Sequence, residues 1–459
     1  MRAILADLKA SGCVIAKDTV AGGYGSRFVP FSKVTSVYCY FKQRRLDLPS
    51  IQMGYLAAIL SGHGHDVVFT RDAIPAGDVA LVLSSLVDYR RENEWADEAR
   101  HRGIRVGFVG LACSKMPELF LDHADFLIMG EPEAAASRLA CGERLTGQIP
   151  SPPVADLDSL PFPKWELPHE AGGKWRHARR RRFPVLASRG CTEFCTYCPH
   201  RILAGYRSRS VRNVADELEQ LSERYPRPHI VFRDPLFTHD RDRCLSLCDE
   251  ILSRGLSLSF DCETRLDGLD DDLLVVLRRA GMRAVSFGVE TVAPETLRRV
   301  ARRPIPEPHQ RAVVDACHRL DIMTVGYYVF GFLQDDWSTI SATIEYSIAL
   351  GTTFAQFKVL TPYPGTPMWK QFAPLVFEGD WQQFNGYTPT FHHPNVTAED
   401  LQFLLGAAYA RFYARPGWLV NYWNLREFLS NALLHRMDRK VLQWHAEKEI
   451  SLVSRAAEC

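Results

Sequence analysis

The stretch LASRGCTEFCTYCPHRILAGYRSRS, residues 186–210, holds three of the chain's twelve cysteines. Cys191, Cys195 and Cys198 are spaced CxxxCxxC. Zinc sites and iron–sulfur clusters generally use four protein ligands. A group of three therefore leaves one coordination position open, takes a ligand from elsewhere in the chain, or is no metal site.

Strands and helices alternate regularly after this stretch. Six strand–helix pairs follow one another from residue 183, beginning with FPVLASRG and ending with the strand FAQFKVLTPYPGTP. Nothing in the pattern indicates a reversal of strand order, so we expect an open, partial barrel of six parallel strands over residues 183–384. Chemistry in such barrels is found at the C-terminal ends of the strands, and the three cysteines follow the first strand.

A second alternating pattern occupies residues 1–145. Its apolar strands are separated by amphipathic helices that end at glycine, which predicts a doubly wound, Rossmann-like parallel sheet. The strands are RAILAD, HDVVFTRD, VALVLSSL, IRVGFVG and ADFLIMG. Residues 146–182, rich in proline and ending in the basic run KWRHARRRR, are expected to be a linker, and residues 385–459 a helical region. The fold class is therefore α/β.

Composition limits the function classes. The chain has 46% hydrophobic and 24% charged residues and a net charge of +1, which argues against a general nucleic-acid binder. Its apolar runs fall short of the roughly 20 residues of a membrane span, and the start lacks the features of a signal peptide. Dilute cysteines suit a reducing compartment, so we expect a cytoplasmic protein.

The three clustered cysteines have several interpretations. Their thiolates could hold three irons of a 4Fe–4S cluster and leave the fourth iron open, which is typical of a catalytic metal. A zinc site would need a fourth ligand, and His200 lies close by in the sequence. Three buried core thiols are a third interpretation. By contrast, Cys244 and Cys248 lie one helical turn apart among leucines, which favours a place in the core.

At these residues the sequence resembles the radical S-adenosylmethionine (SAM) superfamily. The signature of that family is CxxxCxxC with an aromatic residue, here Tyr197, before the third cysteine. The resemblance implies that SAM chelates the open iron of the cluster through its methionine end. An external one-electron reductant then lets the cluster cleave SAM to a 5′-deoxyadenosyl radical, which takes hydrogen from a small-molecule substrate.

Later strands also match the family. The resemblance implies that these residues contact SAM: Tyr197, Asp234, Glu263, Arg265, Glu290, Gly326 and Gly331. One departure follows the fifth strand, where VGYYVFGFLQDD carries Gln334 and Asp335 in place of the family's usual glycine and glutamate.

The N-terminal pattern resembles the cobalamin-binding subgroup of the same superfamily. This resemblance implies corrinoid contacts at strand ends, from Ser84, Ser85, Gly110, Gly130 and Glu131. The DxHxxG loop that supplies a histidine to cobalt in cobalamin mutases is absent, so no lower histidine ligand is predicted. The turn VGLACSKMP also departs from the Gly-Gly-x-His turn of many relatives.

Together these features predict a cobalamin-dependent methyltransferase that acts on an unactivated carbon of a natural-product or lipid-type substrate. Such an enzyme uses SAM twice, once to methylate cobalamin and once as the radical source. The same radical start could instead lead to oxidative ring closure or rearrangement. A non-catalytic corrinoid or iron–sulfur sensor is the alternative outside the enzymes. Aromatic residues of the C-terminal region could line a substrate pocket or form that region's core.

Overall fold

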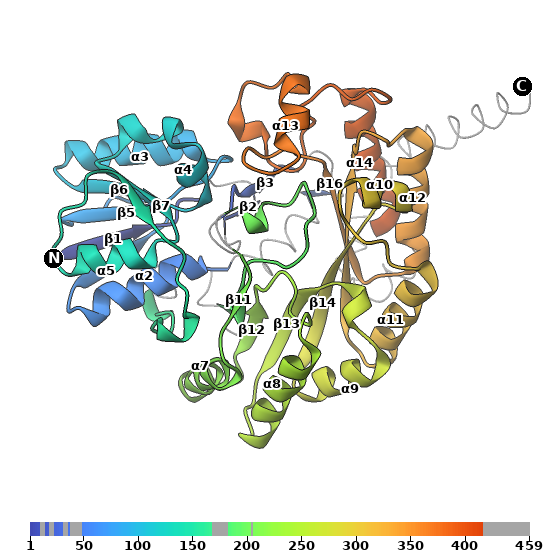
Figure 1. Ribbon diagram of the computed structural model, residues 1–459, viewed down its shortest axis with the longest axis horizontal. Helices are drawn as coiled ribbons and strands as arrows, with labels where there is room; N and C mark the ends of the chain where they lie inside the picture. The colour runs from blue at the N-terminus through green and yellow to red at the C-terminus, as the bar shows by residue number, and fades with distance from the viewer. Residues whose placement is uncertain are drawn as a thin grey trace, which may run out of the picture.

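The computed structural model places two α/β units side by side (Figure 1). We call the first sheet with its helices the N-terminal domain, and the second sheet with its helices the barrel. The structure describes these residues: 1–9, 14–17, 23–30, 35–36, 48–167, 182–202 and 205–415.

The N-terminal domain is built on a six-stranded parallel sheet in the order β4-β1-β5-β6-β7-β8. The chain winds from β1 outward in both directions, so the strand order reverses beside β1 and the prediction of a doubly wound sheet is confirmed. Its strands are β1 (Arg2–Ala6), β4 (Asp66–Thr70), β5 (Val79–Leu83), β6 (Arg105–Val109), β7 (Phe126–Gly130) and β8 (Gly147–Ser151).

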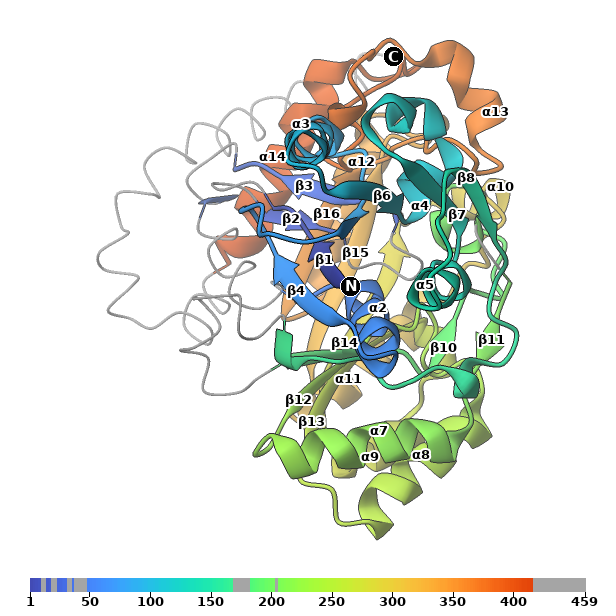
Figure 2. The same ribbon diagram turned by 90° about the vertical axis from the view of Figure 1, so that its left-hand side faces the viewer.

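Two hydrophobic cores cover the two faces of this sheet. Helices α2 (Ile51–Gly62) and α5 (Glu133–Ala140) pack on one face, where Leu5 and Leu81 are buried. Helices α3 (Tyr89–His101) and α4 (Leu111–Lys115) pack on the other, where Ile4 and Val82 are buried (Figure 2). Because both faces are covered, the central strands read as unbroken apolar runs.

Three short elements of the N-terminal domain were not predicted. The hairpin of β2 (Val14–Ala16) and β3 (Ser26–Phe28) and the helix α4 lie where we expected loops. Strand β8 lies inside the expected linker, and its sequence GQIPS is tolerated because an edge strand accepts proline. Most of the linker's basic run falls in 168–181, outside the described residues.

The barrel is a six-stranded parallel sheet in the order β9-β12-β13-β14-β15-β16. Each strand pairs with the next in sequence, and the described strands at the two ends do not pair with each other, so the prediction of an open, partial barrel is confirmed. The strands are β9 (Arg182–Val185), β12 (His229–Phe232), β13 (Ser259–Thr264), β14 (Met282–Glu290), β15 (Met323–Phe330) and β16 (Phe354–Val359).

Helices cover the outer face of the barrel, as Figure 1 shows. Four of these helices begin at side-chain caps, since Ser210, Asp240, Asp270 and Asp336 each accept a hydrogen bond from the first turn of a helix. The helices are α7 (Val211–Arg224), α8 (Arg241–Ser253), α9 (Asp271–Arg279), α10 (Pro294–Arg299), α11 (Glu307–Arg319) and α12 (Trp337–Leu350).

Helix α14 (Ala398–Tyr413) protects the open edge of the barrel. The hydroxyl of Tyr413 accepts from the backbone N–H of Ala355 at 3.1 Å and donates to its carbonyl at 2.7 Å. Tyr409 does the same at Phe357, with 3.3 and 3.1 Å. The two hydroxyls therefore form hydrogen bonds with backbone N–H and carbonyl groups of the edge strand β16 that no neighbouring strand pairs with.

The expected helical C-terminal region is described only as far as residue 415. Among its aromatic residues, Phe384, Tyr387 and Phe391 are buried, which supports the core interpretation for these three. Trp381 is partly exposed and packs against Phe384 with ring centroids 4.6 Å apart, and Trp418, Tyr422 and Trp423 lie outside the described residues. No helix in the described part of the chain is long and apolar enough to cross a membrane.

Candidate functional site

The three clustered cysteines lie on one loop at the carboxyl end of β9. Two short antiparallel strands, β10 (Ser188–Arg189) and β11 (Arg207–Ser208), form the base of this loop, with Arg189 directly opposite Arg207. Gly190 has φ +77°, and a Cβ there would lie 2.5 Å from the carbonyl oxygen of Gly205. The tight base therefore requires glycine, and it places the cysteine loop where barrel chemistry is expected.

None of the three thiols of this loop is in a disulfide, and those of Cys195 and Cys191 lie near enough to Cys198 to influence its charge. Burial raises the pKa of the Cys198 thiol to about 12; the backbone N–H of His200 opposes this shift, and the neighbouring thiols of Cys195 and Cys191 add to it. The backbone N–H of Glu193 donates to Cys191 Sγ at 3.4 Å. Without a bound metal the Cys198 thiol is thus held in its neutral form, since a metal is what would stabilise its thiolate.

The donor set fits a cluster better than a single zinc ion. Among the described residues, no three Cys, His, Asp or Glu side chains are placed so that they could hold one metal ion. The imidazole of His200 is buried and interacts with Glu263 and Arg233, so the residue approaches Cys198 through its backbone. Three thiols that each take a different iron need not converge on one point, which is what a 4Fe–4S cube requires.

Arg302 and Glu290 form a buried ion pair beside the cysteine loop. Arg302 Nη2 lies 3.3 Å from Glu290 Oε1 and donates to the carbonyl of Gly288 at 2.5 Å. Arg302 Nη1 lies 3.8 Å from Cys195 Sγ. Glu290 follows a register shift in β14 and has φ +67°, a strained conformation for a residue with a side chain. Strain of this kind is concentrated at functional sites, which supports a role for Glu290.

The loop after β15 lies against the aromatic residue of the cysteine signature. The ring of Tyr197 packs edge-on against Phe332 with centroids 5.7 Å apart. Asp335 Oδ2 accepts hydrogen bonds from the N–H groups of Gly331 and Phe332 at 2.9 and 3.0 Å. Asp335, which stands where the family usually has glutamate, therefore stabilises the turn at Gly331, whose φ is +94°. Burial raises the pKa of Asp335 to about 7.

Glu263 and Arg265, on and just after β13, differ in their surroundings. Glu263 Oε1 accepts from Arg233 at 2.6 Å, and Glu263 remains partly exposed. Arg265 is buried and donates to Asp267 at 3.0 Å, and it lies 3.7 Å from Glu193 of the cysteine loop. Of the two, Glu263 keeps the greater access for a ligand.

Asp234 and Gly326 occupy structural places. Both oxygens of Asp234 accept hydrogen bonds after β9, from the N–H of Ala187 at 3.0 Å and the hydroxyl of Ser188 at 2.5 Å. Gly326 lies on the same face of β15 as buried Tyr328, and a Cβ on it would lie 3.0 Å from the Tyr328 ring. Their assignment to SAM remains a prediction.

The residues predicted to contact a corrinoid do lie at the carboxyl ends of β5, β6 and β7. Ser84 and Ser85 are fully buried, however, and their hydroxyls donate to Val109 at 2.8 Å and to Glu92 at 2.6 Å. Gly110 and Gly130 have φ +112° and +127°, so glycine is required there by the backbone itself. The Glu131 carboxylate forms ion pairs with Arg189 and Arg207 of the barrel.

A buried charged group at this same edge was missed by the sequence analysis. Lys17 Nζ lies 2.6 Å from Glu92 Oε1 and 3.9 Å from Asp88 Oδ2. Neither carboxylate oxygen of buried Asp7 has a hydrogen-bond partner among the described residues, although Lys9 Nζ lies 3.6 Å away. These acceptors lie next to the reversal of strand order, where such sheets bind ligands. Unused buried acceptors fit a corrinoid, which carries amide N–H donors on its ring.

Comparisons with known proteins agree with this geometry. Residues 185–346 match the radical SAM superfamily. An uncharacterized methyltransferase, PH0819, of Pyrococcus horikoshii is 27% identical over 282 residues, which cover 60% of this chain and 61% of that protein. Bacteriochlorophyllide d C-12(1)-methyltransferase of Chlorobaculum tepidum is 23% identical over 85% of both chains. An anaerobic magnesium-protoporphyrin IX monomethyl ester cyclase of Cereibacter sphaeroides is 24% identical over 64% of this chain and 48% of its own length.

A solved structure extends the likeness to both halves of the chain. The cobalamin-dependent SAM radical enzyme OxsB, with aqua-cobalamin and SAM bound, superposes with a TM-score of 0.67 at 14% identity. The match covers 95% of this chain and 71% of that one, so it includes the N-terminal domain as well as the barrel. Residues 185–346 thus form a radical SAM domain, and the fold of the chain, with its N-terminal domain included, is similar to that of the cobalamin-dependent enzyme OxsB.

Proposed function

We propose that this protein is a cobalamin-dependent radical SAM methyltransferase that adds a methyl group to an unactivated carbon of a natural-product or lipid-type substrate. The observation that carries the proposal is the loop at the carboxyl end of the first barrel strand, which holds three thiols outside any disulfide, with Cys191 and Cys195 near Cys198. Relatives named as methyltransferases support the methyl-transfer outcome.

The chain's own residues have distinct parts in this proposal. Cys191, Cys195 and Cys198 would hold a 4Fe–4S cluster, and Glu290 and Glu263 would hold SAM. With SAM and cobalamin bound, these groups supply a 5′-deoxyadenosyl radical and a methyl donor. Arg302 keeps positive charge beside the thiolate of Cys195, and the packed barrel and N-terminal domain exclude water from the reacting carbon.

The proposal includes the partners of the reaction. The substrate is a small molecule, and an external one-electron carrier supplies the reducing electron. We infer that nucleic acid is not a partner, because a net charge of +1 gives no general basic surface. We also infer that the protein works in the cytoplasm, since none of its nine described cysteines forms a disulfide.

The test is anaerobic reconstitution of the protein with iron, sulfide and hydroxocobalamin, followed by SAM and dithionite. The expected products are 5′-deoxyadenosine and methionine, and a visible spectrum that keeps the corrinoid bands after desalting. Cys195→Ala should remove 5′-deoxyadenosine formation, whereas Cys244→Ala, a buried thiol of helix α8, should retain it. Absence of 5′-deoxyadenosine from the wild-type protein would refute the radical assignment, and absence of the corrinoid bands after desalting would refute the cobalamin assignment.

A second candidate is an oxidative cyclase or rearrangement enzyme, which is supported by the relative from Cereibacter sphaeroides that is named as a cyclase. The two candidates differ in the mass of the product. Methylation adds one CH₂ to the substrate, whereas cyclisation adds no carbon. Mass spectrometry of small molecules from cells with and without the chain separates them.

A further inference from the structure

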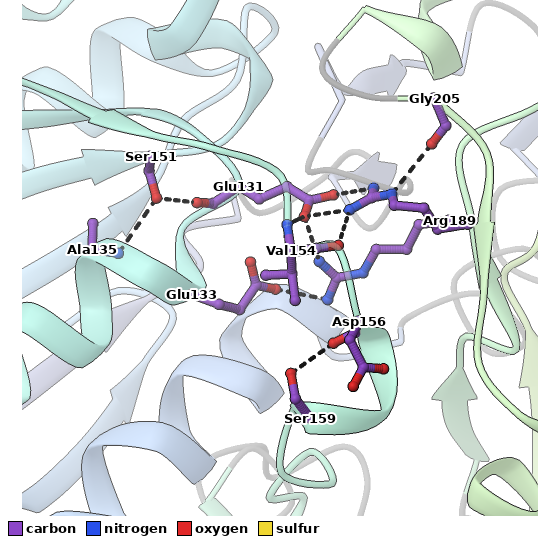
Figure 3. Close-up of polar contacts among 10 residues, drawn as sticks. Glu131, Glu133, Ala135, Ser151, Val154, Asp156, Ser159, Arg189 and Gly205 are labelled. Carbon is purple, nitrogen blue, oxygen red and sulfur yellow. Dashed lines mark hydrogen bonds and ion pairs between the residues drawn. The ribbon is translucent and has the colours of Figure 1, made fainter.

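The N-terminal domain contacts the base of the cysteine loop through an interdomain charge cluster, which we define as Glu131, Glu133, Arg189 and Arg207. Figure 3 labels the first three of these residues. Arg189 and Arg207 face each other across β10 and β11, so they bracket the loop of residues 190–206. All three cysteines of the signature lie between these two arginines.

Both arginines reach the same carboxylate of the N-terminal domain. Arg207 contacts Glu131 through two nitrogens, at 2.6 and 3.0 Å. Arg189 Nη1 lies 3.3 Å from Glu131, and its Nη2 donates to Glu133 at 2.7 Å. One glutamate therefore contacts both ends of the loop, and the second holds Arg189 from another direction.

The charge cluster is shielded from solvent. The side chains of Glu131 and Glu133 are each 2% exposed and that of Arg189 is 6% exposed. The guanidinium of Arg189 also lies 5.0 Å above the ring of Tyr55, which belongs to α2. Burial alone would lower the pKa of Arg189, but Glu133, Tyr55 and Glu131 outweigh it and raise the pKa, so this cation stays charged. Such desolvated pairs have strict geometry and are screened little by salt.

Glu131 is itself fixed by its own domain. Its Oε2 accepts from the backbone N–H of Val154 at 2.8 Å, and its backbone carbonyl accepts from the hydroxyl of Ser151. Gly130 before it has no room for a side chain, because a Cβ would lie 2.0 Å from the carbonyl oxygen of Ser151. The position of β8 therefore determines where the Glu131 carboxylate meets the barrel.

We propose that Glu131 and Glu133 are positioning residues that hold the cysteine loop, through Arg189 and Arg207, at a fixed place relative to the N-terminal domain. This rests on the proposed function, in which the radical forms in the barrel and the methyl donor binds the N-terminal domain. The charge cluster fixes the distance and the orientation between those two centres. It replaces the predicted role of Glu131 as a corrinoid contact, because both of its oxygens are occupied by protein donors.

The experiment compares the full-length wild-type protein with Glu131→Gln and Glu133→Gln. Asp380→Asn is the matched control, since Asp380 also pairs across the two domains, with Arg90 at 3.2 Å, but through exposed side chains away from the loop. Hydrogen exchange is measured over residues 190–206 with and without hydroxocobalamin. The paramagnetic resonance spectrum of the dithionite-reduced cluster is recorded with SAM.

Glu131→Gln should speed exchange in the loop at least about tenfold, because local opening no longer breaks a buried ion pair. We expect hydroxocobalamin to slow exchange of the loop in the wild type and to lose that effect in Glu131→Gln. The resonance lines of the SAM-bound cluster should broaden in the same variant and remain sharp in Asp380→Asn. Arg207→Lys, which keeps the cation, should recover most of the loop protection that Arg207→Met loses.

Unchanged exchange and unchanged resonance lines in Glu131→Gln would overturn the proposal, as would equal changes in Asp380→Asn. If Glu131→Gln does not fold, the same two measurements are made on Glu133→Gln, which loses only the ion pair with Arg189. Unchanged exchange and unchanged resonance lines in that variant would overturn the proposal. The proposed function is judged separately. A wild-type protein that forms no 5′-deoxyadenosine refutes that function, whereas the exchange measurement needs no turnover.

Discussion

Replacing Arg302 by methionine tests the buried ion pair beside the cysteine loop. Methionine has a similar length and no charge, so it leaves Glu290 buried without its partner. The side chains of Arg302 and Glu290 are 11% and 10% exposed. At 3.3 Å the attraction between unit charges is about 5 kcal/mol for an effective dielectric constant of 20. Removal of one partner from such a pair costs about 3–5 kcal/mol of unfolding free energy.

The assay is urea unfolding of the metal-free protein, followed by circular dichroism, so that no cofactor contributes to the result. The control is Arg298→Met, which breaks a pair with Glu295 on the same segment, where the two side chains are 62% and 66% exposed. We expect this control to lose less than about 1 kcal/mol. The double variant Arg302→Met, Glu290→Met should regain most of the loss, because it removes the uncompensated carboxylate.

Two results would refute this reasoning. A loss below about 1 kcal/mol in Arg302→Met would mean that the pair is solvated like a surface pair. Additive losses in the double variant would mean that the two side chains do not interact.

Further predictions concern the cluster, a titrating carboxyl and the barrel edge. Alanine at all three loop cysteines should abolish the cluster absorbance near roughly 400 nm, and full iron content in that variant would contradict the assignment. The pKa of Asp335 is raised from 3.8 to about 7, so the folded state binds this proton more tightly. Its stabilising effect is therefore present at low pH and is lost as pH rises from about 4 to about 7, by at most about 4 kcal/mol. Asp335→Asn should remove that part of the pH dependence in urea titrations, and an identical profile would refute the assignment. Tyr409→Phe and Tyr413→Phe should each cost about 1–3 kcal/mol, since each leaves a backbone N–H and carbonyl of β16 unpaired. If urea unfolding shows a loss of only a few tenths of a kcal/mol in unfolding free energy, water replaces the hydroxyl as the hydrogen-bond partner.

The alternating pattern of the sequence predicted both sheets because their strands are buried on two faces and their helices are amphipathic. Parallel strands such as VALVL and their covering helices have local signals that need no knowledge of the partner. Strand β8 and the hairpin of β2 and β3 lack such signals. They form because a neighbouring strand offers backbone groups, which only the folded chain reveals.

The candidate site likewise contains residues that local sequence patterns identify and residues that only the folded chain reveals. The cysteines were found because their spacing is local, whereas Arg302 and Arg189 act through partners far away in the sequence. Ser84 and Ser85 lie at the predicted edge of the sheet, but their hydroxyls are used inside the domain. A sequence shows that a polar residue ends a strand, and it does not show which donor or acceptor that residue will meet.

The cysteine loop depends on contacts from several distant segments. The backbone of Thr196 donates to Val300 at 3.0 Å and accepts from Met368 at 3.1 Å, so two later parts of the barrel hold the middle of the loop. The N-terminal domain holds the base of the loop through the interdomain charge cluster. Few of these contacts are local, and a loop of this length loses considerable conformational entropy when it is ordered. Preorganised thiols therefore require the complete fold, so cluster insertion should follow the docking of the two domains and should not precede it.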